Sequence, residues 1–321
     1  MADTRIAIVT FGDDLHALAI QTRLREMPGM ACDVIEVDRV ADNDPGLSWS
    51  LDPGHFRVTV PTRDDDRLNP ADCHAIWYRR FNHPQAAAGD LADPVAAEIV
   101  NSATPRSLMG VLLDTFRGRW VSHPQATQRA ENKLLQLRAA QTAGLAVPKT
   151  LVSNDPDAIR RFCDQVDGRT VMKAVCGTVH SQLFTLDMKA EHLADDDALR
   201  LCPTIFQEYV PGTRHIRALC CNEEVHAATI DSPELDWRGD LNVPTTRIEM
   251  DPSIAQRLGE VLRLLGLRMG VFDMKIDESD RPVFLELNPQ GQFLFVEGLT
   301  GMDLIGSFAH FLSREALATC A

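Results

Sequence analysis

The chain has 321 residues, enough for two or three compact units, and its 45% hydrophobic and 24% charged content is ordinary for a globular protein. It contains no run of about 18 apolar residues, so no transmembrane helix is expected. The N-terminus lacks the basic and apolar regions of a signal peptide. The formal net charge of −14 argues against non-specific binding to nucleic acid or to an anionic membrane. Eight cysteines without CxxC spacing indicate reduced thiols, a cytoplasmic location and no zinc site.

The first part of the chain alternates short apolar strands with helical stretches. The expected strands are 5–10, 33–37 and 74–78, and the expected helices are 16–26, 94–103 and 106–116. Pro105 should break or kink the helix between the last two stretches. Strand, helix and strand in this order predict an open α/β unit with a parallel sheet. No GxGxxG follows the first strand, so a dinucleotide site has little support.

Beyond Trp120 the pattern changes to a long helix followed by several short strands. The expected helices are 125–143, 156–165, 254–265 and one from 304, and the expected strands are 150–153, 170–175, 183–188, 204–210, 215–221, 225–230, 270–276 and 282–287. A polar loop is expected at 231–247. Boundaries near 123 and 205 divide the chain into segments 1–123, 124–205 and 206–321. The fold class is predicted to be mixed α/β, of the α+β kind.

Asp273, Glu286 and Asn288 form the strongest chemical pattern. Alternate residues of a strand share a face, so Glu286 and Asn288 in FLELNPQG point to the same side. If residues 270–276 and 282–287 pair as a hairpin, Asp273 faces them across the sheet. Two carboxylates and an amide oxygen at one place suit magnesium held together with substrate phosphates. The solvent-facing side of an ordinary hairpin explains the same alternation equally well.

Two lysines could bind phosphate. Lys173 lies in VMKAVCG between apolar residues, where an ammonium must reach solvent or find an anionic partner. A phosphate would serve, and an edge-strand lysine that blocks aggregation is an equal alternative. Lys133 lies on the expected helix 125–143, and taken alone it is better explained as a solvated surface lysine.

The segment FQEYVPG, residues 206–212, is an apolar strand that must stop pairing at its Val-Pro-Gly end. Free backbone groups at such an end could hydrogen-bond the edge of a purine. From these residues alone a plain turn is the better explanation.

Taken in chain order, these features resemble the ATP-grasp superfamily. The resemblance runs from about residue 124 to residue 301 and rests on the order of the features. Lys133 comes first, Lys173 follows forty positions later, and then come the QEYVPG hinge, an aspartate and a Glu-x-Asn pair. The resemblance implies an ATP-grasp fold behind an N-terminal open α/β domain, the pre-ATP-grasp domain. It also implies that ATP and Mg²⁺ are the cofactors.

The resemblance implies roles for individual residues. Lys133 and Lys173 would contact the ATP phosphates, Gln207, Glu208, Tyr209 and Val210 would line the adenine site, and Asp273, Glu286 and Asn288 would hold magnesium. Arg217, in HIRALCC, matches the arginine that steadies the acyl phosphate in RimK-like members. Related sequences usually carry an acidic residue two positions earlier, where this chain has His215, so the resemblance assigns that position no role.

A narrower resemblance is to the graspetide synthetases, the ATP-grasp maturases of ribosomal peptides of the microviridin type. It rests on IWYRRF (76–81), VPKTLVSNDP (147–156), LDWRGD (235–240) and FLELNPQGQ (284–292). These enzymes form side-chain ester or amide crosslinks within a precursor peptide, and their N-terminal unit and central domain help to place its helical leader. The implied partner is a ribosomal precursor peptide with leader and core. Related enzymes often pair, so a homodimer stays open.

The implied chemistry is the activation of a carboxylate. A peptide Asp or Glu attacks the γ-phosphorus of ATP, and a Thr or Ser hydroxyl, or a Lys amine, of the same peptide then attacks the acyl phosphate. Lys133, Lys173 and Arg217 would supply positive charge where negative charge builds up. Arg238, in DWRGD, could hold the acceptor carboxylate or the phosphate in bidentate fashion, and a loop ion pair is an equal alternative.

Two other function classes stay open. One is a RimK-like ligase that adds glutamate to a protein, or a dipeptide ligase, although WYRR and NPQGQ argue against it. The other is a non-catalytic nucleotide-binding or peptide-binding protein, although the full set of lysines and metal ligands argues against it. No Ser-His-Asp set suggests hydrolysis. The loop with His180 and Ser181 could cover the phosphates, but a solvated turn explains it better.

Overall fold

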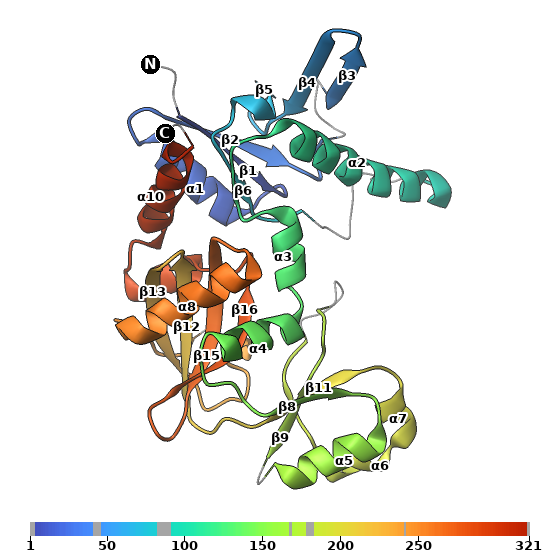
Figure 1. Ribbon diagram of the computed structural model, residues 1–321, viewed down its shortest axis with the longest axis vertical. Coiled ribbons are helices and arrows are strands. Elements are labelled where there is room, and N and C mark those ends of the chain that lie inside the picture. The colour runs from blue at the N-terminus through green and yellow to red at the C-terminus, as the bar shows by residue number, and fades with distance from the viewer. Residues whose placement is uncertain are drawn as a thin grey trace. The chain divides into compact units, whose positions relative to one another are not determined.

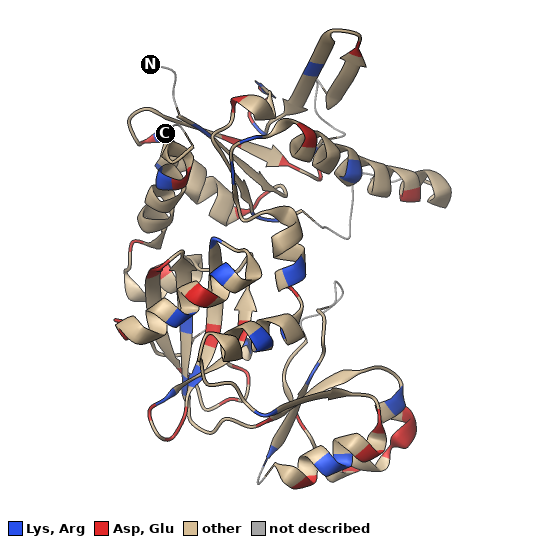
Figure 2. Cartoon of the chain, in the orientation of Figure 1, with Lys and Arg blue, Asp and Glu red and all other residues tan. Residues whose placement is uncertain are grey.

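The structure, a computed structural model, describes residues 4–40, 46–81, 91–166, 169–177, 183–240 and 242–319. The chain groups into two compact units, one of Met1–Pro124 with Asp303–Ala321 and one of Gln125–Met302. Both units mix helices with strands, which confirms the predicted α/β class (Figure 1). Acidic and basic side chains are interspersed along the elements of both units (Figure 2). The negative net charge is therefore not confined to one of them.

A parallel four-stranded sheet lies at the centre of the first unit, in the order β2-β1-β6-β7. Its strands are β1 (Thr4–Thr10), β2 (Met30–Glu36), β6 (Ala75–Tyr78) and β7 (Arg119–Val121). The segments of β1 and β6 are continuous apolar runs because a parallel strand is buried on both faces. This sheet confirms the predicted open parallel arrangement, and β7 is a strand that the sequence prediction missed.

Two helices of the first unit pack against each other and against its sheet. α1 (Leu15–Arg25) begins after Asp14, whose side chain accepts a hydrogen bond from the His16 N–H and caps the helix. α10 (Leu304–Leu317) packs against α1 and β1. The sequence placed α10 in the C-terminal segment, because a terminal helix carries no local signal for the unit that it contacts. The contacts group it with the N-terminal residues, and the three-segment division stays a prediction.

α2 (Pro94–Thr115) is one continuous helix, so of the break or kink expected at Pro105 the break is wrong and the kink stays a prediction. A proline removes one helical N–H donor, which costs least where water reaches the backbone. The preceding turn is open to solvent, with Asn101 and Ala103 exposed. The buried side chains of α2 all lie at or after Leu108, and they pack on the sheet.

A small antiparallel sheet of the first unit was not predicted. It contains β3 (Ser48–Asp52), β4 (His55–Pro61) and β5 (Arg67–Leu68), and the short 3₁₀ helix η1 (Pro70–Asp72) follows it. β3 and the first half of β4 are largely exposed, so neither shows an alternation of buried and exposed residues. Without that alternation the sequence gives no strand signal.

The second unit contains a four-stranded antiparallel sheet, in the order β10-β9-β11-β8, which we call the small lobe. Its elements are β8 (Thr150–Ser153), α5 (Pro156–Gln165), β9 (Thr170–Lys173), β10 (Leu186–Asp187), α6 (Ala190–Ala194), α7 (Asp196–Arg200) and β11 (Thr204–Glu208). The four strands and α5 were predicted. The two five-residue helices α6 and α7 were not, because they are too short for a helical period.

The helix predicted over residues 125–143 is wrong, because two helices occupy this segment. α3 (Pro124–Ala130) ends before Glu131, and α4 (Lys133–Thr142) begins after Asn132. The Asn132 side chain accepts hydrogen bonds from the first N–H groups of α4, those of Leu134 (3.0 Å) and Leu135 (3.3 Å). Asparagine favours this capping position, so it ends one helix and starts the next. Lys133 therefore stands in the first turn of α4.

The remainder of the second unit is a five-stranded antiparallel sheet in the order β14-β13-β12-β15-β16, which we call the large lobe. Its elements are β12 (Arg214–Cys221), β13 (Glu224–Asp231), the 3₁₀ helix η2 (Trp237–Gly239), β14 (Thr245–Ile248), α8 (Pro252–Leu265), β15 (Met269–Ile276), β16 (Pro282–Asn288) and α9 (Leu294–Thr300). Apolar side chains of α4, α8 and the sheet form its core. The predicted polar loop contains η2 and β14, which the sequence did not reveal, and α9 was also missed.

Candidate functional site

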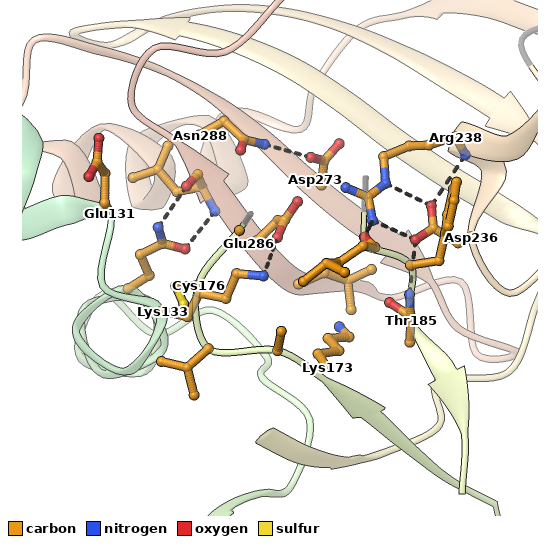
Figure 3. A pocket seen from close by; sticks show the side chains of 18 of the residues that line it. Glu131, Lys133, Lys173, Cys176, Thr185, Asp236, Arg238, Asp273, Glu286 and Asn288 are labelled. Atoms are coloured by element: carbon orange, nitrogen blue, oxygen red, sulfur yellow. Dashed lines mark hydrogen bonds and ion pairs between the residues drawn. The ribbon is translucent and has the colours of Figure 1, made fainter. Parts of the chain in front are cut away.

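The second unit holds a pocket of about 480 Å³. Its lining comes from the start of α4, the end of β9 with the following loop, residues 235–238, and β15 and β16 (Figure 3). Six of the site residues proposed from the sequence line it, namely Lys133, Lys173, Arg238, Asp273, Glu286 and Asn288. Residues separated by about 150 positions are thus brought to one place.

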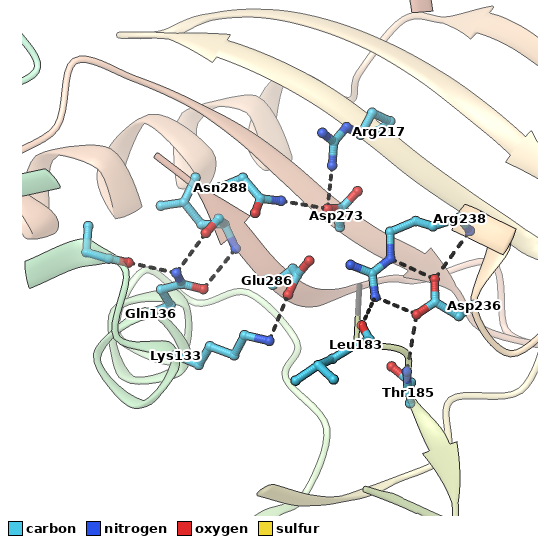
Figure 4. Close-up of polar contacts among 12 residues, drawn as sticks. Lys133, Gln136, Leu183, Thr185, Arg217, Asp236, Arg238, Asp273, Glu286 and Asn288 are labelled. Atoms are coloured by element: carbon cyan, nitrogen blue, oxygen red, sulfur yellow. Dashed lines mark hydrogen bonds and ion pairs between the residues drawn. The ribbon is translucent and has the colours of Figure 1, made fainter. Parts of the chain in front are cut away.

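The predicted hairpin is confirmed. β15 and β16 pair antiparallel, with Asp273 opposite Glu286 and Val271 opposite Asn288. Asn288 Nδ2 donates a hydrogen bond to Asp273 Oδ2 at 2.9 Å, so the amide and the carboxylate share a face (Figure 4). The register shifts between Asp273 and Met274, a β-bulge. Bulges bend a strand and turn side chains toward a site.

Asp273 is enclosed by its partners. Arg217 Nη1 donates to Asp273 Oδ2 at 2.5 Å, and Arg217 Nη2 donates to the Gln292 carbonyl at 2.8 Å. Asp273 Oδ1 is buried and accepts no hydrogen bond from the described residues. Burial raises the pKa of Asp273, and the Arg217 guanidinium offsets part of that rise. An enclosed carboxylate oxygen without a partner is suited to a cation.

Glu286 is surrounded by three cations. Lys133 Nζ lies 3.3 Å from Glu286 Oε2. Burial tends to raise the pKa of Glu286, but Lys133, Arg238 and Lys173 together outweigh it and lower that pKa. Glu286 is therefore ionised at neutral pH, with Oε1 outside the ion pair.

Lys173 is the last residue of β9 and is half-buried, and it projects toward the space between Glu286 and Arg238 (Figure 3). Burial is the main cause that lowers its pKa to about 8, with Glu286 opposing the shift and Lys133 adding to it. No salt bridge pairs Lys173 with a described residue, so its ammonium is open to an anionic ligand.

Arg238 is held in place by a bidentate pair with Asp236. Nε donates to Asp236 Oδ1 at 2.8 Å and Nη2 donates to Asp236 Oδ2 at 2.5 Å, while Nη2 also donates to the Leu183 carbonyl at 3.2 Å. The Thr185 N–H donates to Asp236 at 3.2 Å (Figure 4). Two parallel hydrogen bonds fix the orientation of the guanidinium at the pocket wall, whereas a loose surface ion pair would leave that orientation free.

The predicted adenine residues lie elsewhere in the second unit. Among the described residues that line the pocket, none comes from Gln207–Val210. Gln207 Nε2 donates to Thr150 Oγ1 at 2.9 Å, and Gln207 Oε1 is buried without a hydrogen bond from the described residues. The Arg169 guanidinium lies 4.4 Å from the centre of the Tyr209 ring, and Lys275 Nζ lies 4.6 Å from it. The role of Gln207, Glu208, Tyr209 and Val210 in binding adenine stays a prediction.

Sequence reasoning missed a buried glutamine that positions the site. Gln136 Nε2 donates to the carbonyls of Ala130 and Leu287, both at 2.7 Å, and its Oε1 accepts from the Leu287 N–H at 3.0 Å. These bonds join α4 to β16, and so fix Lys133 relative to Glu286 (Figure 4). No local pattern marks Gln136, because its partner Leu287 lies 151 positions away and Ala130 six positions away.

Residues Asn288–Gln292 contact both members of the Arg217–Asp273 pair, because the Asn288 amide donates to Asp273 and the Gln292 carbonyl accepts from Arg217. The backbone of Gly291 lies close against β15. A Cβ at position 291 would lie 2.5 Å from Val271 Cβ, which no real side chain permits. Glycine is therefore required at this position for packing.

No family model matches the chain. Curated relatives include a probable alpha-L-glutamate ligase of Citrobacter koseri, 28% identical over 200 residues, which span 60% of this chain and 66% of that protein. The ribosomal protein bS6–L-glutamate ligase of Escherichia fergusonii is 26% identical over 203 residues. The match thus spans slightly less than two thirds of the first relative.

Solved structures match almost the whole chain. The macrocyclase MdnC of Microcystis aeruginosa, bound with the precursor peptide MdnA, has a TM-score of 0.82 and 25% identity over 96% of this chain and 99% of its own. The macrocyclase MdnB of the same organism has a TM-score of 0.78 and 26% identity. A RiPP-associated ATP-grasp ligase of Chryseobacterium gregarium, in complex with ADP and with leader and core peptides, shares the fold at a TM-score of 0.84 and 23% identity. This chain is an ATP-grasp protein.

Other features of this ATP-grasp protein bear on its site. Among the described residues no three His, Cys, Asp or Glu side chains gather as a metal site, so the candidate set needs the Asn288 amide. In the same part of the chain no helix is long and apolar enough to cross a membrane. His180 and Ser181, predicted to lie in a loop near the phosphates, fall outside the described residues.

Proposed function

We propose that this ATP-grasp protein is an ADP-forming ligase that crosslinks side chains of a ribosomal precursor peptide. It converts an Asp or Glu side chain of that peptide to an acyl phosphate and joins it to a hydroxyl or an amine of the same peptide. The observation that carries this proposal is the match to a peptide-bound macrocyclase over 96% of the chain, at a TM-score of 0.82. The enzyme acts in the cytoplasm on a precursor with leader and core.

Lys133 and Lys173 bind the ATP phosphates. Both line the pocket, and Lys173 has no salt bridge with a described residue. An ammonium in a half-buried site gains most from an anionic partner. The hinge residues Gln207, Glu208, Tyr209 and Val210 receive the adenine, where the buried Gln207 Oε1 can accept a hydrogen bond from an exocyclic amine.

Asp273, Glu286 and Asn288 hold Mg²⁺. The donor set fits, because Asp273 Oδ1 is enclosed without a partner among the described residues. Asn288 turns its Nδ2 toward Asp273, which leaves its amide oxygen for a cation. Hard oxygen ligands of this kind, completed by phosphate oxygens, are typical of magnesium. When bound, the ion neutralises charge on the phosphates during transfer.

The two arginines act on the reacting groups. In the first step a carboxylate oxygen of the peptide bonds to the γ-phosphorus, and the bond from that phosphorus to the bridging oxygen breaks, so ADP leaves with the electron pair. Arg217 stabilises the charge on the phosphoryl group, and Arg238, fixed by Asp236, grips the peptide carboxylate or the phosphate. In the second step the nucleophile attacks the acyl carbon and phosphate leaves.

A glutamate ligase is the second candidate, favoured by the curated relatives. That similarity covers only 60% of the chain, while the similarity to the macrocyclase MdnC covers 96% of it. The two functions differ in their products. A crosslinked peptide loses water, whereas a glutamylated protein gains an amino-acid residue.

Mass spectrometry separates the candidates. The full-length enzyme is incubated with ATP, Mg²⁺ and the short peptide encoded next to its gene, with and without free glutamate. Crosslinking predicts a loss of about 18 Da for each ADP formed, with no need of glutamate. A gain in mass that depends on glutamate would favour the ligase, and no ADP with any peptide would favour a non-catalytic binding protein. Light scattering of the same sample tests the homodimer.

A further inference from the structure

Four apolar side chains line the pocket around the Asp236–Arg238 pair. They come from two segments, residues 183–184 before β10 and residues 235 and 237 on either side of Asp236. We call them the apolar ledge, which consists of Leu183, Phe184, Leu235 and Trp237. Leu183 lies beside Arg238, whereas Lys133 lies on the other side of Glu286 (Figure 4). The ledge therefore belongs to the part of the pocket near Arg238.

Two members of the ledge are open to solvent. Leu183 is 42% exposed and Phe184 is 43% exposed. Single apolar side chains on a surface need no explanation, whereas adjacent ones that line a ligand pocket mark a place for an apolar ligand group. Covering them would remove apolar surface from water, which favours binding.

The ledge is held in a fixed position relative to the Arg238 guanidinium. The Leu183 carbonyl accepts from Arg238 Nη2 at 3.2 Å, and the centre of the guanidinium lies 5.9 Å from the centre of the Phe184 ring. The Trp237 ring is only 8% exposed and packs 5.8 Å from the Phe295 ring. A group bound by Arg238 is therefore always next to the same apolar surface.

One nitrogen of Arg238 remains for a ligand. Nε and Nη2 donate to Asp236 and to the Leu183 carbonyl, and no described residue accepts a hydrogen bond from Nη1. A carboxylate of the peptide that binds Nη1 would lie beside Phe184. Consecutive Cα atoms are only about 3.8 Å apart, so a residue next to the bound Asp or Glu can reach the ledge with its side chain.

The other ligand groups do not suit this surface. The hinge residues 207–210, which we propose to receive adenine, do not line the pocket. The phosphates and Mg²⁺ are strongly hydrated and gain nothing from an apolar wall. We infer that the apolar ledge binds an apolar side chain of the precursor peptide, that of a residue directly flanking the activated Asp or Glu. The inference rests on the proposed function and makes Leu183 and Phe184 specificity-determining residues.

Versions of the precursor peptide test the inference. Each of the two residues that flank one activated Asp or Glu is set in turn to Leu or to Gln, which have similar sizes, and ADP release is measured against peptide concentration. At one flank we expect Gln to raise the KM for the peptide about tenfold over Leu, with kcat unchanged within about twofold. Equal KM values for Leu and Gln at both flanks would overturn the inference.

A variant of Phe184 tests the contact directly. In Phe184→Ala we expect the KM for the Leu peptide to rise about tenfold and the KM for the Gln peptide to stay the same, because only the apolar side chain touches the ring. Phe184→Leu keeps an apolar side chain and should recover most of the preference. Leu186→Ala is the matched control, since Leu186 is 52% exposed on β10 and does not line the pocket.

The outcomes separate the inference from the proposed function. If Phe184→Ala raises the KM for both peptides by the same factor, the ring does not read the flanking residue and the inference is wrong. If it raises the KM for ATP and not that for the peptide, the ledge serves the nucleotide and the inference is also wrong. The proposed function stands in both cases. If the wild type releases no ADP with any peptide, the proposed function fails and the inference fails with it.

Discussion

Lys133 and Glu286 form an ion pair of 3.3 Å between the first turn of α4 and strand β16. The pair joins a proposed phosphate-binding residue to a proposed magnesium ligand. Each side chain therefore keeps the other in the pocket while ATP and the metal ion are absent. Binding of ATP and Mg²⁺ would exchange this ion pair for two stronger contacts, one to phosphate and one to the metal.

Glu286→Gln should remove most of the activity. The amide keeps the shape of the side chain but loses the charge that binds Mg²⁺, so we expect ADP release to fall about 100-fold or more. Glu260→Gln is the control, because Glu260 pairs with Arg263 on the surface of α8. Full ATP-dependent activity in Glu286→Gln would show that the metal assignment is wrong.

ATP binding should weaken as the pH rises above about 8. Burial lowers the pKa of Lys173 to about 8, so its ammonium is charged below that pH and neutral above it. We expect the KM for ATP to rise between about pH 8 and pH 9.5, where the positive charge is lost. Lys173→Arg stays charged throughout and should flatten the profile. A wild-type KM that does not change over this range contradicts the role of Lys173.

Lys275 provides the comparison for that pH profile. Its pKa is also lowered to about 8, by burial and by the nearby Arg169. Lys275 contacts Tyr209 and does not line the pocket. We therefore expect Lys275→Arg to leave the rise in KM in place, while Lys173→Arg removes it.

Gln136→Leu should destabilise the second unit. The substitution leaves the Ala130 and Leu287 carbonyls and the Leu287 N–H without their partner, at a cost of about 3 kcal/mol in the free energy of unfolding. Gln141→Leu, on the exposed side of the same helix, should change that free energy by less than about 0.5 kcal/mol. Urea unfolding measures both, and equal stability of the two variants would contradict the anchoring role.

Asp236→Asn should impair substrate handling more than ATP binding. The amide can no longer make two charged contacts with Arg238, so the guanidinium loses its fixed position. We expect the kcat/KM for the peptide to fall about tenfold, with little change in the KM for ATP. If the KM for ATP rises by about the same factor as the kcat/KM for the peptide falls, Asp236 only supports the fold.

The sequence predicted the strands that carry the site and most of its charged residues. Asp273, Glu286 and Asn288 could be predicted to lie together because alternate residues of a strand share a face. Pairing the two strands as a hairpin then brings the three side chains to one side of the sheet. The break between α3 and α4 could have been found, since Asn132 is a good helix cap inside an otherwise helical stretch. The expected break at Pro105 came from the local rule that proline disrupts a helix. Solvent around this turn reduces the free-energy cost of the missing N–H donor, so the helix continues.

Other features could not be predicted from the sequence. Gln136 acts through Leu287, which is distant in sequence, and Asp236 acts through partners on irregular backbone. Neither residue belongs to a helical or strand periodicity that the sequence would show. The exposed hairpin of β3 and β4 lacks the burial contrast that reveals a strand. His215 could be noticed only as a departure from related sequences, because the enclosure of its Nε2 depends on how the folded chain packs around it.

Gly291 changes what the motif NPQGQ means. A side chain at this position would overlap Val271, so the glycine of the motif is required for packing and takes no part in the chemistry. The loop that it permits carries the Asn288 amide and the Gln292 carbonyl to the two members of the Arg217–Asp273 pair. A chain that has lost catalysis but kept its fold would therefore keep this glycine. A motif search that relies on it would count inactive relatives as enzymes unless Asp273 and Glu286 are checked too.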